Sequence, residues 1–262
     1  MKYFDSHAHY YDERFGSECE VGVDELIDAL LSSSVCGIIN VGTSPETCRL
    51  VLDSVGKHEG MYSALGIHPS DSQYLDGTAE ENVARIEEMI KDPRSKCVAL
   101  GEIGLDYHYP DTNKECQMKY FRLQMSLAER LDIPVVIHDR EAHGDVMDVV
   151  REYPRVRGVL HSYSGSSEMA AELVRRGYMI SFSGTLTFTN AKRVREVAAS
   201  LPHESVLIET DCPYLAPHPH RGKLNHSGYL EYTCASLADV FGISAEECAA
   251  LTYTNARRFF GI

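Results

Sequence analysis

The sequence predicts an α/β fold in which eight parallel strands alternate with helices and close into a (β/α)8 TIM barrel. Apolar, β-branched runs alternate with amphipathic segments along the whole chain. These apolar runs are continuous, which is typical of parallel strands that are buried on both faces. A length of 262 residues is normal for one barrel of this kind. We therefore expect a single domain over residues 1–262.

The predicted strands are short apolar runs that turn-forming residues separate. They cover residues 3–5, 35–41, 61–67, 97–103, 134–138, 158–162, 178–183 and 206–210. With about eight such strands, closure into a barrel is the economical arrangement. An open doubly wound sheet is the competing fold, but the chain lacks the G-x-G-x-x-G turn that often marks it.

The predicted helices lie between these strands and follow a period nearer 3.6 than 2. They cover residues 23–33, 45–57, 79–91, 114–131, 144–152, 168–176 and 191–200, with two more at 229–241 and 245–259. Ser44 before Pro45 is a typical helix start, and Ile133-Pro134 is a helix stop ahead of the fifth strand.

Composition narrows the class of protein. The net charge of -14 argues against a protein that wraps a long nucleic-acid duplex on a basic surface, although a local phosphate site with bound metal remains compatible with it. No signal peptide or membrane span is apparent, so we expect a cytoplasmic protein. The eight cysteines form no C-x-x-C pair and are expected to be free thiols. Cys212 is not favoured as a nucleophile, because it points away from its neighbour Asp211 on an extended segment.

His7 and His9 near the N-terminus are the clearest functional signal, because residues i and i+2 of an extended run point the same way. More residues of this kind lie at or just beyond the C-terminal ends of other predicted strands: His68, Glu102, His138, His161 and Asp211. The strand ends of a barrel converge on one face, so all of these residues should share one mouth. Imidazole nitrogens with carboxylate oxygens suit Zn²⁺, Mn²⁺, Fe²⁺ or Co²⁺. The donors exceed the three that usually hold one catalytic zinc, which favours two metals with a bridging carboxylate.

Seven motifs carry a resemblance to a known family. They are Asp5-Ser6-His7-Ala8-His9, Gly66-Ile67-His68-Pro69, Gly101-Glu102-Ile103-Gly104-Leu105-Asp106-Tyr107, Pro134-Val135-Val136-Ile137-His138, His161-Ser162-Tyr163-Ser164-Gly165, Glu209-Thr210-Asp211-Cys212-Pro213 and Arg221-Gly222-Lys223. In this order the motifs resemble those of the TatD family of metal-dependent deoxyribonucleases in the amidohydrolase superfamily. The resemblance runs from residue 3 to roughly residue 260.

The resemblance implies two divalent metal ions, with Zn²⁺, Mg²⁺ or Mn²⁺ as candidates. The implied ligands are His7, His9, Glu102, His138, His161 and Asp211. Glu102 would bridge the two ions in place of the carbamylated lysine that is frequent in the superfamily. Glu102 and Asp211 would be the catalytic residues, and Asp211 would orient or deprotonate the attacking water.

The resemblance also implies that His68 and Arg221 contact the substrate phosphate. The chain differs from the family pattern in the loop after Arg221, which lacks Asn-Glu-Pro, and at Ser162-Tyr163, where Cys-Phe is common. These differences concern substrate preference rather than metal binding.

Other residues near the predicted mouth keep two interpretations. For Asp106 the two interpretations are support of a metal ligand and positioning of a loop. The tyrosine group Tyr107, Tyr109 and Tyr163 could stack on a base, but lining the barrel rim is the favoured interpretation.

Three functions remain on the sequence alone. The leading hypothesis is a hydrolase that cleaves phosphodiester bonds of DNA from a strand end with a metal-activated water. The alternative is a hydrolase of small amides, lactones or phosphoesters on the same binuclear site, since a fold does not fix a substrate. Arg221, Lys223 and His68 favour phosphate. A non-catalytic binding barrel is disfavoured, because facing ligands of this kind are costly without a metal.

Overall fold

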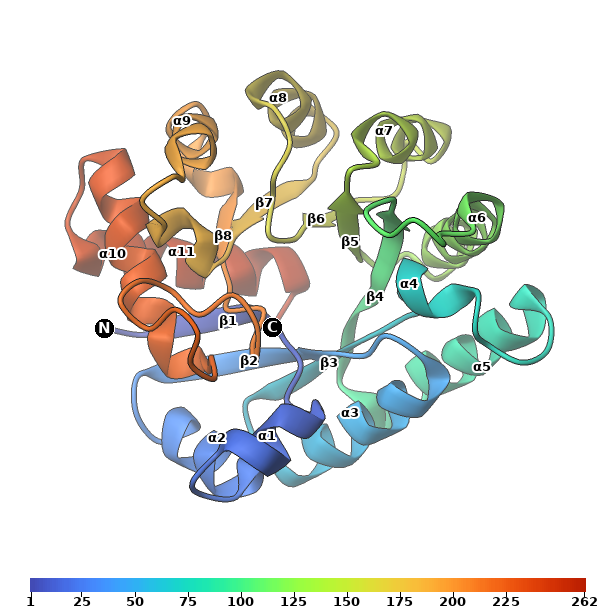
Figure 1. Ribbon diagram of the computed structural model, residues 1–262, viewed down its shortest axis with the longest axis horizontal. Helices are drawn as coiled ribbons and strands as arrows, with labels where there is room; N and C mark the ends of the chain where they lie inside the picture. Colours follow the sequence, from blue (N-terminus) through green and yellow to red (C-terminus); the bar gives the residue numbers. More distant parts are fainter.

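The computed structural model describes all residues from 1 to 262 and contains one sheet of eight strands in sequence order. The strands are β1 Tyr3–Ala8, β2 Val35–Val41, β3 Met61–Leu65, β4 Cys97–Asp106, β5 Val135–Arg140, β6 Gly158–Leu160, β7 Met179–Phe182 and β8 Val206–Ile208. Each strand pairs in parallel with the next. Helices surround the strands on the outside (Figure 1). The predicted barrel is therefore confirmed.

The helices follow the strands in the order that the sequence predicts. They are α1 Glu13–Glu18, α2 Val23–Leu31, α3 Pro45–Lys57, α4 Pro69–Ser72, α5 Ala79–Lys91, α6 Lys114–Leu131, α7 His143–Glu152, α8 Ser167–Arg175, α9 Lys192–Ala199, α10 Leu230–Phe241 and α11 Ala245–Phe260, with 3-10 turns at Pro93–Ser95, Gly184–Thr187, His203–Ser205 and Ser227–Tyr229. Ser44 caps α3 by accepting a hydrogen bond from the Thr47 amide, as the Ser-Pro pair predicts. No helix combines the length and the apolar character that crossing a bilayer requires.

The barrel closes at a seam between β1 and the segment that follows β8. A single parallel bridge joins Ala8 to Cys212 there. The amide of Asp211 donates to the carbonyl of His7 at 2.9 Å, and the amide of His9 donates to that of Cys212 at 2.8 Å. The seam thus fixes Asp211 beside the two N-terminal histidines, although about 200 residues separate them in the sequence.

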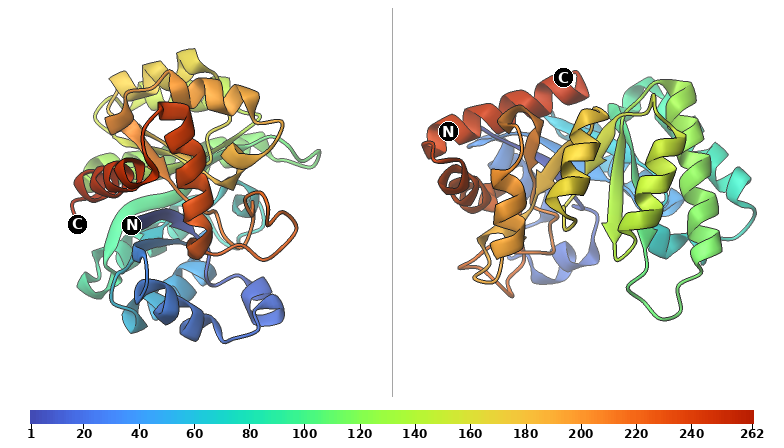
Figure 2. Two further views of the ribbon diagram at one scale, coloured as in Figure 1. Left: turned by 90° about the vertical axis from the view of Figure 1, so that its left-hand side faces the viewer. Right: turned by 90° about the horizontal axis from the view of Figure 1, so that it is seen from above.

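Two apolar clusters fill the barrel and its outer layer. The larger cluster packs strands against helices. The smaller one takes a residue from every strand, which places it inside the barrel: Phe4, Ile39, Val41, Ala64, Ala99, Val136, Val159, Met179 and Leu207. Ala256, Phe259 and Phe260 of α11 complete this inner cluster. Figure 2 shows α11 across the end of the barrel at which the strands begin. The opposite end, where the strands finish, remains open for a site.

Strand ends differ most from the prediction. β1 continues to Ala8 and β4 to Asp106, beyond the predicted ends at residues 5 and 103. His7 therefore lies within a strand and not after it, whereas Glu102 lies within β4 as the prediction has it. Two short helices, α1 and α4, were not predicted, because one or two helical turns leave too little periodicity to detect. Local capping explains α1, whose preceding Asp12 accepts a hydrogen bond from the amide of Arg14.

Candidate metal centre

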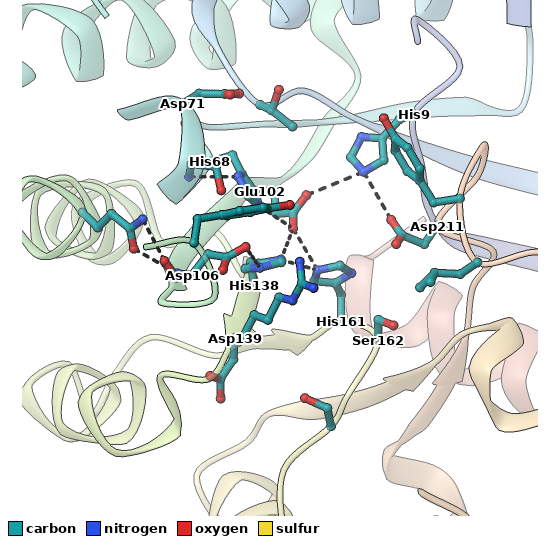
Figure 3. Close-up of a pocket in the computed structure, with 18 of the residues that line it drawn as sticks. His9, His68, Asp71, Glu102, Asp106, His138, Asp139, His161, Ser162 and Asp211 are labelled. Carbon is teal, nitrogen blue, oxygen red and sulfur yellow. Dashed lines mark hydrogen bonds and ion pairs between the residues drawn. The ribbon is translucent and has the colours of Figure 1, made fainter. Parts of the chain in front are cut away.

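Histidine and carboxylate side chains from several strands meet at the open end of the barrel. His7 lies on β1, His9 just beyond it, Glu102 on β4, His138 on β5, His161 after β6 and Asp211 after β8. His7 and Glu102 are buried, and Figure 3 shows His9, Glu102, His138, His161 and Asp211 directed toward one another. All of the metal ligands that the sequence suggests are thus brought together.

His7, His9 and Asp211 form the first group of donors. The Nε2 atoms of the two histidines are 3.0 Å apart, and Asp211 Oδ1 lies 3.4 Å from His9 Nε2. Asp211 reaches this position through a left-handed backbone conformation with φ of 57°. The closing seam and this turn together aim the carboxylate at both imidazoles.

Glu102 lies between this group and a second one. Its Oε1 is 2.8 Å from His161 Nε2 and 2.9 Å from His138 Nδ1. Its Oε2 faces the other way and lies 3.3 Å from His7 Nε2. One carboxylate therefore presents a separate oxygen to each group of histidines.

Glycines around Glu102 allow this approach. A Cβ on Gly101 would lie 2.6 Å from Val136 Cβ, and one on Gly104 would lie 2.1 Å from the carbonyl oxygen of His138. Both contacts are too short for any side chain, so β4 can lie against β5 only with glycine at these positions. The G-E-x-G pattern thus sets the distance between Glu102 and His138.

Three of the imidazole rings are held in orientation by a hydrogen bond at the ring nitrogen that faces away from the centre. His9 Nδ1 contacts the Val41 carbonyl at 2.8 Å, His161 Nδ1 contacts Glu209 Oε1 at 3.3 Å, and His138 Nε2 contacts Asp106 Oδ2 at 3.2 Å. Each ring is left with its other nitrogen turned toward the centre. Partners of this kind set the tautomer and direction of metal-binding histidines.

We expect Glu209→Gln to weaken metal binding by roughly 10- to 100-fold, the usual effect of losing such a partner. Glu209 is fully buried, and its Oε1 also accepts a hydrogen bond from the Ser162 amide at 2.7 Å. Glutamine keeps that acceptor and the side-chain shape but removes the charge that faces His161. Competition with a chromophoric chelator measures the affinity, and Glu88→Gln on the exposed side of α5 is the matched control. Equal affinities in all three proteins would refute the role of Glu209.

Electrostatics keeps the two central carboxylates ionised. Burial opposes ionisation of Glu102, but the surrounding imidazoles, led by His161 and His68, outweigh it and hold the pKa of this carboxyl well below its ordinary value. Burial also acts against Asp211, yet its hydrogen bond with His9 and the nearby His161 lower its pKa. For His7 burial dominates and lowers the pKa, which favours the neutral ring. Although burial opposes it, contacts with the carboxylates raise the pKa of His9, His138 and His161. A metal ion binds ionised carboxylate and neutral imidazole, so it would displace protons from these three rings.

The donor set fits divalent cations. Three groups have all their ligand atoms within 4.8 Å of one another: His7, His9 and Asp211; His7, Glu102 and His161; and His68, Glu102 and His138. The Nδ1 of His7 is buried without a hydrogen-bond partner, so its ring makes polar contacts only through the Nε2 that faces the centre. Nitrogen and oxygen lone pairs this close repel one another unless protons or cations lie between them. Mixed nitrogen and oxygen donors match ions of the zinc and manganese type.

The two predicted phosphate contacts lie in different places. His68 Nε2 is 3.4 Å from Glu102 Oε1, so this ring lies among the metal donors. Arg221 is not among the residues that line the cavity at the barrel mouth. Its guanidinium lies over the Phe188 ring, 4.3 Å from the centroid.

The cavity over the donors has a volume of about 1020 Å³ and contains residues to which the sequence assigned no role. Asp71 is one of them, and burial raises its pKa. The sequence also assigned no role to Glu209, which does not line the cavity but is fully buried against His161. Its spacing of two residues from Asp211 could have suggested it, because alternate residues of an extended segment share a face. The contact of Asp106 with His138 agrees with the first of the two interpretations given for Asp106, support of a metal ligand. Cys212 is fully buried, and burial raises the pKa of its thiol, so it is not an available nucleophile.

Comparisons with known proteins agree over nearly the whole chain. The family described as "TatD related DNase" matches residues 4–261. The chain is 38% identical to the uncharacterized metal-dependent hydrolase YabD of Bacillus subtilis, over 99% of each chain. It is 34% identical to the uncharacterized metal-dependent hydrolase TatD of Mycobacterium tuberculosis, over 97% of each. The crystal structure of YJJV, a TatD homolog from Escherichia coli, superposes with a TM-score of 0.89 at 29% identity, covering 99% of this chain and 98% of that one.

Proposed function

The chain belongs to the TatD-related DNase family of metal-dependent hydrolases, and from this premise we propose that it hydrolyses phosphodiester bonds of DNA from a strand end with two divalent metal ions. His7, His9, Glu102 and Asp211 would hold one ion, and Glu102, His138 and His161 the other. The observation that carries the proposal is the placement of Glu102, whose two oxygens face two separate histidine groups.

Two ions, when bound, would lower the pKa of water and neutralise charge on the phosphoryl oxygens. Asp211 lines the cavity and is only 13% exposed, so its ionised carboxylate can orient the attacking water and accept its proton. His68 lines the same cavity and can donate a hydrogen bond to a phosphate oxygen. Arg221 would reach a phosphate only after leaving the Phe188 ring.

The form of the cavity supports attack at a strand end. It lies over a barrel whose interior is filled with side chains, so a substrate can enter only from the mouth. A single strand end can enter a pocket that is closed at its base in this way. The net charge of -14 likewise argues against a surface that binds a long duplex.

The second candidate is a hydrolase of small amides, lactones or phosphoesters on the same donors. The acidic lining of the cavity favours it, since Asp12, Asp71, Asp111 and Asp139 repel a polyanion. Dihydroorotase from Campylobacter jejuni shares the fold at a TM-score of 0.61 and 14% identity, a likeness that concerns the fold alone.

Reconstitution should yield about two divalent ions per chain, because the two oxygens of Glu102 face separate histidines. Protein stripped with a chelator, incubated with Zn²⁺ or Mn²⁺ and freed of excess ion would be measured by elemental analysis. Glu88→Gln should bind the same amount. A stoichiometry near zero after such treatment would remove the metal centre from consideration.

The function itself is tested by supplying metal-stripped protein with single divalent ions and presenting DNA, RNA, a model phosphodiester and a lactone. We expect metal-dependent release of mononucleotides from the ends of linear DNA and no cleavage of closed circular DNA. Rapid lactone hydrolysis without any DNA cleavage would favour the small-molecule alternative. Cleavage of circular DNA would contradict attack from an end.

A further inference from the structure

The cavity at the barrel mouth contains one basic side chain other than histidine, that of Arg140. Of the residues that line it, Arg140 alone is a lysine or arginine. Arg140 is the last residue of β5, two positions after His138. Alternate residues of a strand point to the same face, so Arg140 is directed to the same side of β5 as His138, toward the mouth.

The guanidinium of Arg140 donates no hydrogen bond to the rest of the protein. Arg122, Arg130 and Arg151 each bind a glutamate at 2.6 to 3.0 Å, whereas Arg140 makes no ion pair and no side-chain hydrogen bond. Its backbone carbonyl accepts a hydrogen bond from the Tyr107 amide at 2.9 Å, which holds the residue in place. An exposed, positioned guanidinium beside carboxylates keeps its donors free for a ligand anion.

The single aromatic contact of Arg140 is with Tyr109. The guanidinium carbon lies 5.6 Å from the centroid of this ring. The His108 ring meets Tyr109 edge-on with centroids 5.2 Å apart. Tyr109 lines the cavity and remains 50% exposed, so much of its ring is available to a ligand.

The other two tyrosines of the predicted group differ from Tyr109. Tyr107 donates its hydroxyl to Asp145 at 2.7 Å, and Tyr163 is buried with its hydroxyl bonded to the Ser166 carbonyl at 2.8 Å. Both therefore have structural contacts. Tyr109 alone in this group combines a large exposed area with a neighbouring free cation.

We propose that Arg140 and Tyr109 form a nucleotide subsite beside the metal centre, in which Arg140 binds a non-bridging phosphate oxygen and Tyr109 stacks on the adjacent base. This inference rests on the proposed function and deepens it. A phosphodiester carries one negative charge next to a flat base, and a guanidinium with an exposed aromatic ring complements both features. Arg140 ends the strand that carries His138, and Tyr109 follows the end of the neighbouring strand β4.

Binding is measured first, on metal-free protein in EDTA, by fluorescence anisotropy of a short fluorescein-labelled oligothymidylate. We expect Arg140→Gln and Tyr109→Ala each to raise Kd about tenfold or more, and Tyr109→Phe to stay near wild type because it keeps the ring. Arg257→Gln is the matched control, since Arg257 lies 5.8 Å from the Tyr253 ring on α11, at the other end of the barrel. Circular dichroism checks that every variant is folded.

Kinetics of the metal-loaded enzyme separates the two contacts. With thymidine 5′-(p-nitrophenyl phosphate), both Arg140→Gln and Tyr109→Ala should raise KM more than they lower kcat. With methyl p-nitrophenyl phosphate, which has no base, only Arg140→Gln should raise KM.

Several outcomes would overturn the subsite. It fails if Arg140→Gln binds the oligonucleotide like wild type, or if Tyr109→Phe loses as much affinity as Tyr109→Ala. It fails also if Arg221→Gln weakens binding and Arg140→Gln does not. Wild-type protein that binds the oligonucleotide through Arg140 and Tyr109 but cleaves no DNA would refute the proposed function and leave the subsite standing. Wild-type protein that binds no oligonucleotide would refute the subsite, whatever it hydrolyses.

Discussion

Asp211→Asn is expected to lower kcat by roughly 10²-fold or more, the scale of a lost general base. The carboxylate of Asp211 lies 3.4 Å from His9 Nε2 and lines the cavity, where its low pKa keeps it ionised. Asparagine has nearly the same shape but carries no charge and cannot accept a proton. KM should change less than kcat, because substrate is held mainly by other groups.

The backbone makes asparagine the correct replacement at this position. Asp211 has a φ of 57°, a left-handed conformation that asparagine tolerates and alanine resists. Loss of activity in Asp211→Asn can therefore be assigned to the side chain and not to a displaced seam. Asp53→Asn on the exposed face of α3 is the control and should retain full kcat. If Asp211→Asn raises KM and leaves kcat unchanged, the role in proton transfer is wrong.

Glu102→Ala is expected to abolish most of the activity and to reduce bound metal from about two ions to one or fewer per chain. Its two oxygens contact both histidine groups, at 2.8 Å on the side of His161 and at 3.3 Å on the side of His7. Alanine removes the one carboxylate that the groups share. The second group would retain only neutral imidazoles, which bind a divalent ion less tightly than an anionic donor does.

The fold of Glu102→Ala should survive. The apolar clusters inside and outside the barrel do not include Glu102, and barrel stability resides mainly in such packing. Thermal unfolding followed by circular dichroism should remain cooperative, and elemental analysis of the same sample reports the metal. Near wild-type turnover with both ions retained would show that Glu102 does not bridge. An unfolded Glu102→Ala would be replaced by Glu102→Gln, for which the same loss of metal is expected.

The sequence predicted the fold because the signals of a barrel are local and repeated. The bounds of α3, α5 and α6 match the prediction to the residue, since each helix has a cap and a clear period. Strand bounds were less accurate, because β1 and β4 continue through polar residues that face the mouth. The prediction ended β1 at Asp5, because Ser6 and His7 interrupt the apolar run from which a strand is recognised.

Donor types and their order along the chain were also available from the sequence. His7, His9, Glu102, His138, His161 and Asp211 lie near the ends of strands or just after them, and the barrel topology requires those strand ends to meet. The sequence could not supply the pairing of Glu209 with His161 or the position of Arg140 next to Tyr109. These contacts join segments that are far apart along the chain, and no local pattern encodes them.

By itself the sequence determined the eight-fold alternation, the family and the set of donors, because each depends on residue type and spacing within one segment. Only the tertiary structure decided how these donors are shared. In the structure each oxygen of Glu102 faces a different histidine group, and the barrel seam holds Asp211 beside His7. Arg221 packs on the Phe188 ring, whereas Arg140 lines the cavity. The physical reason is that a side chain's direction depends on strand register, on loop conformation and on the partners that compete for its charge. Those quantities exist only after the strands have closed.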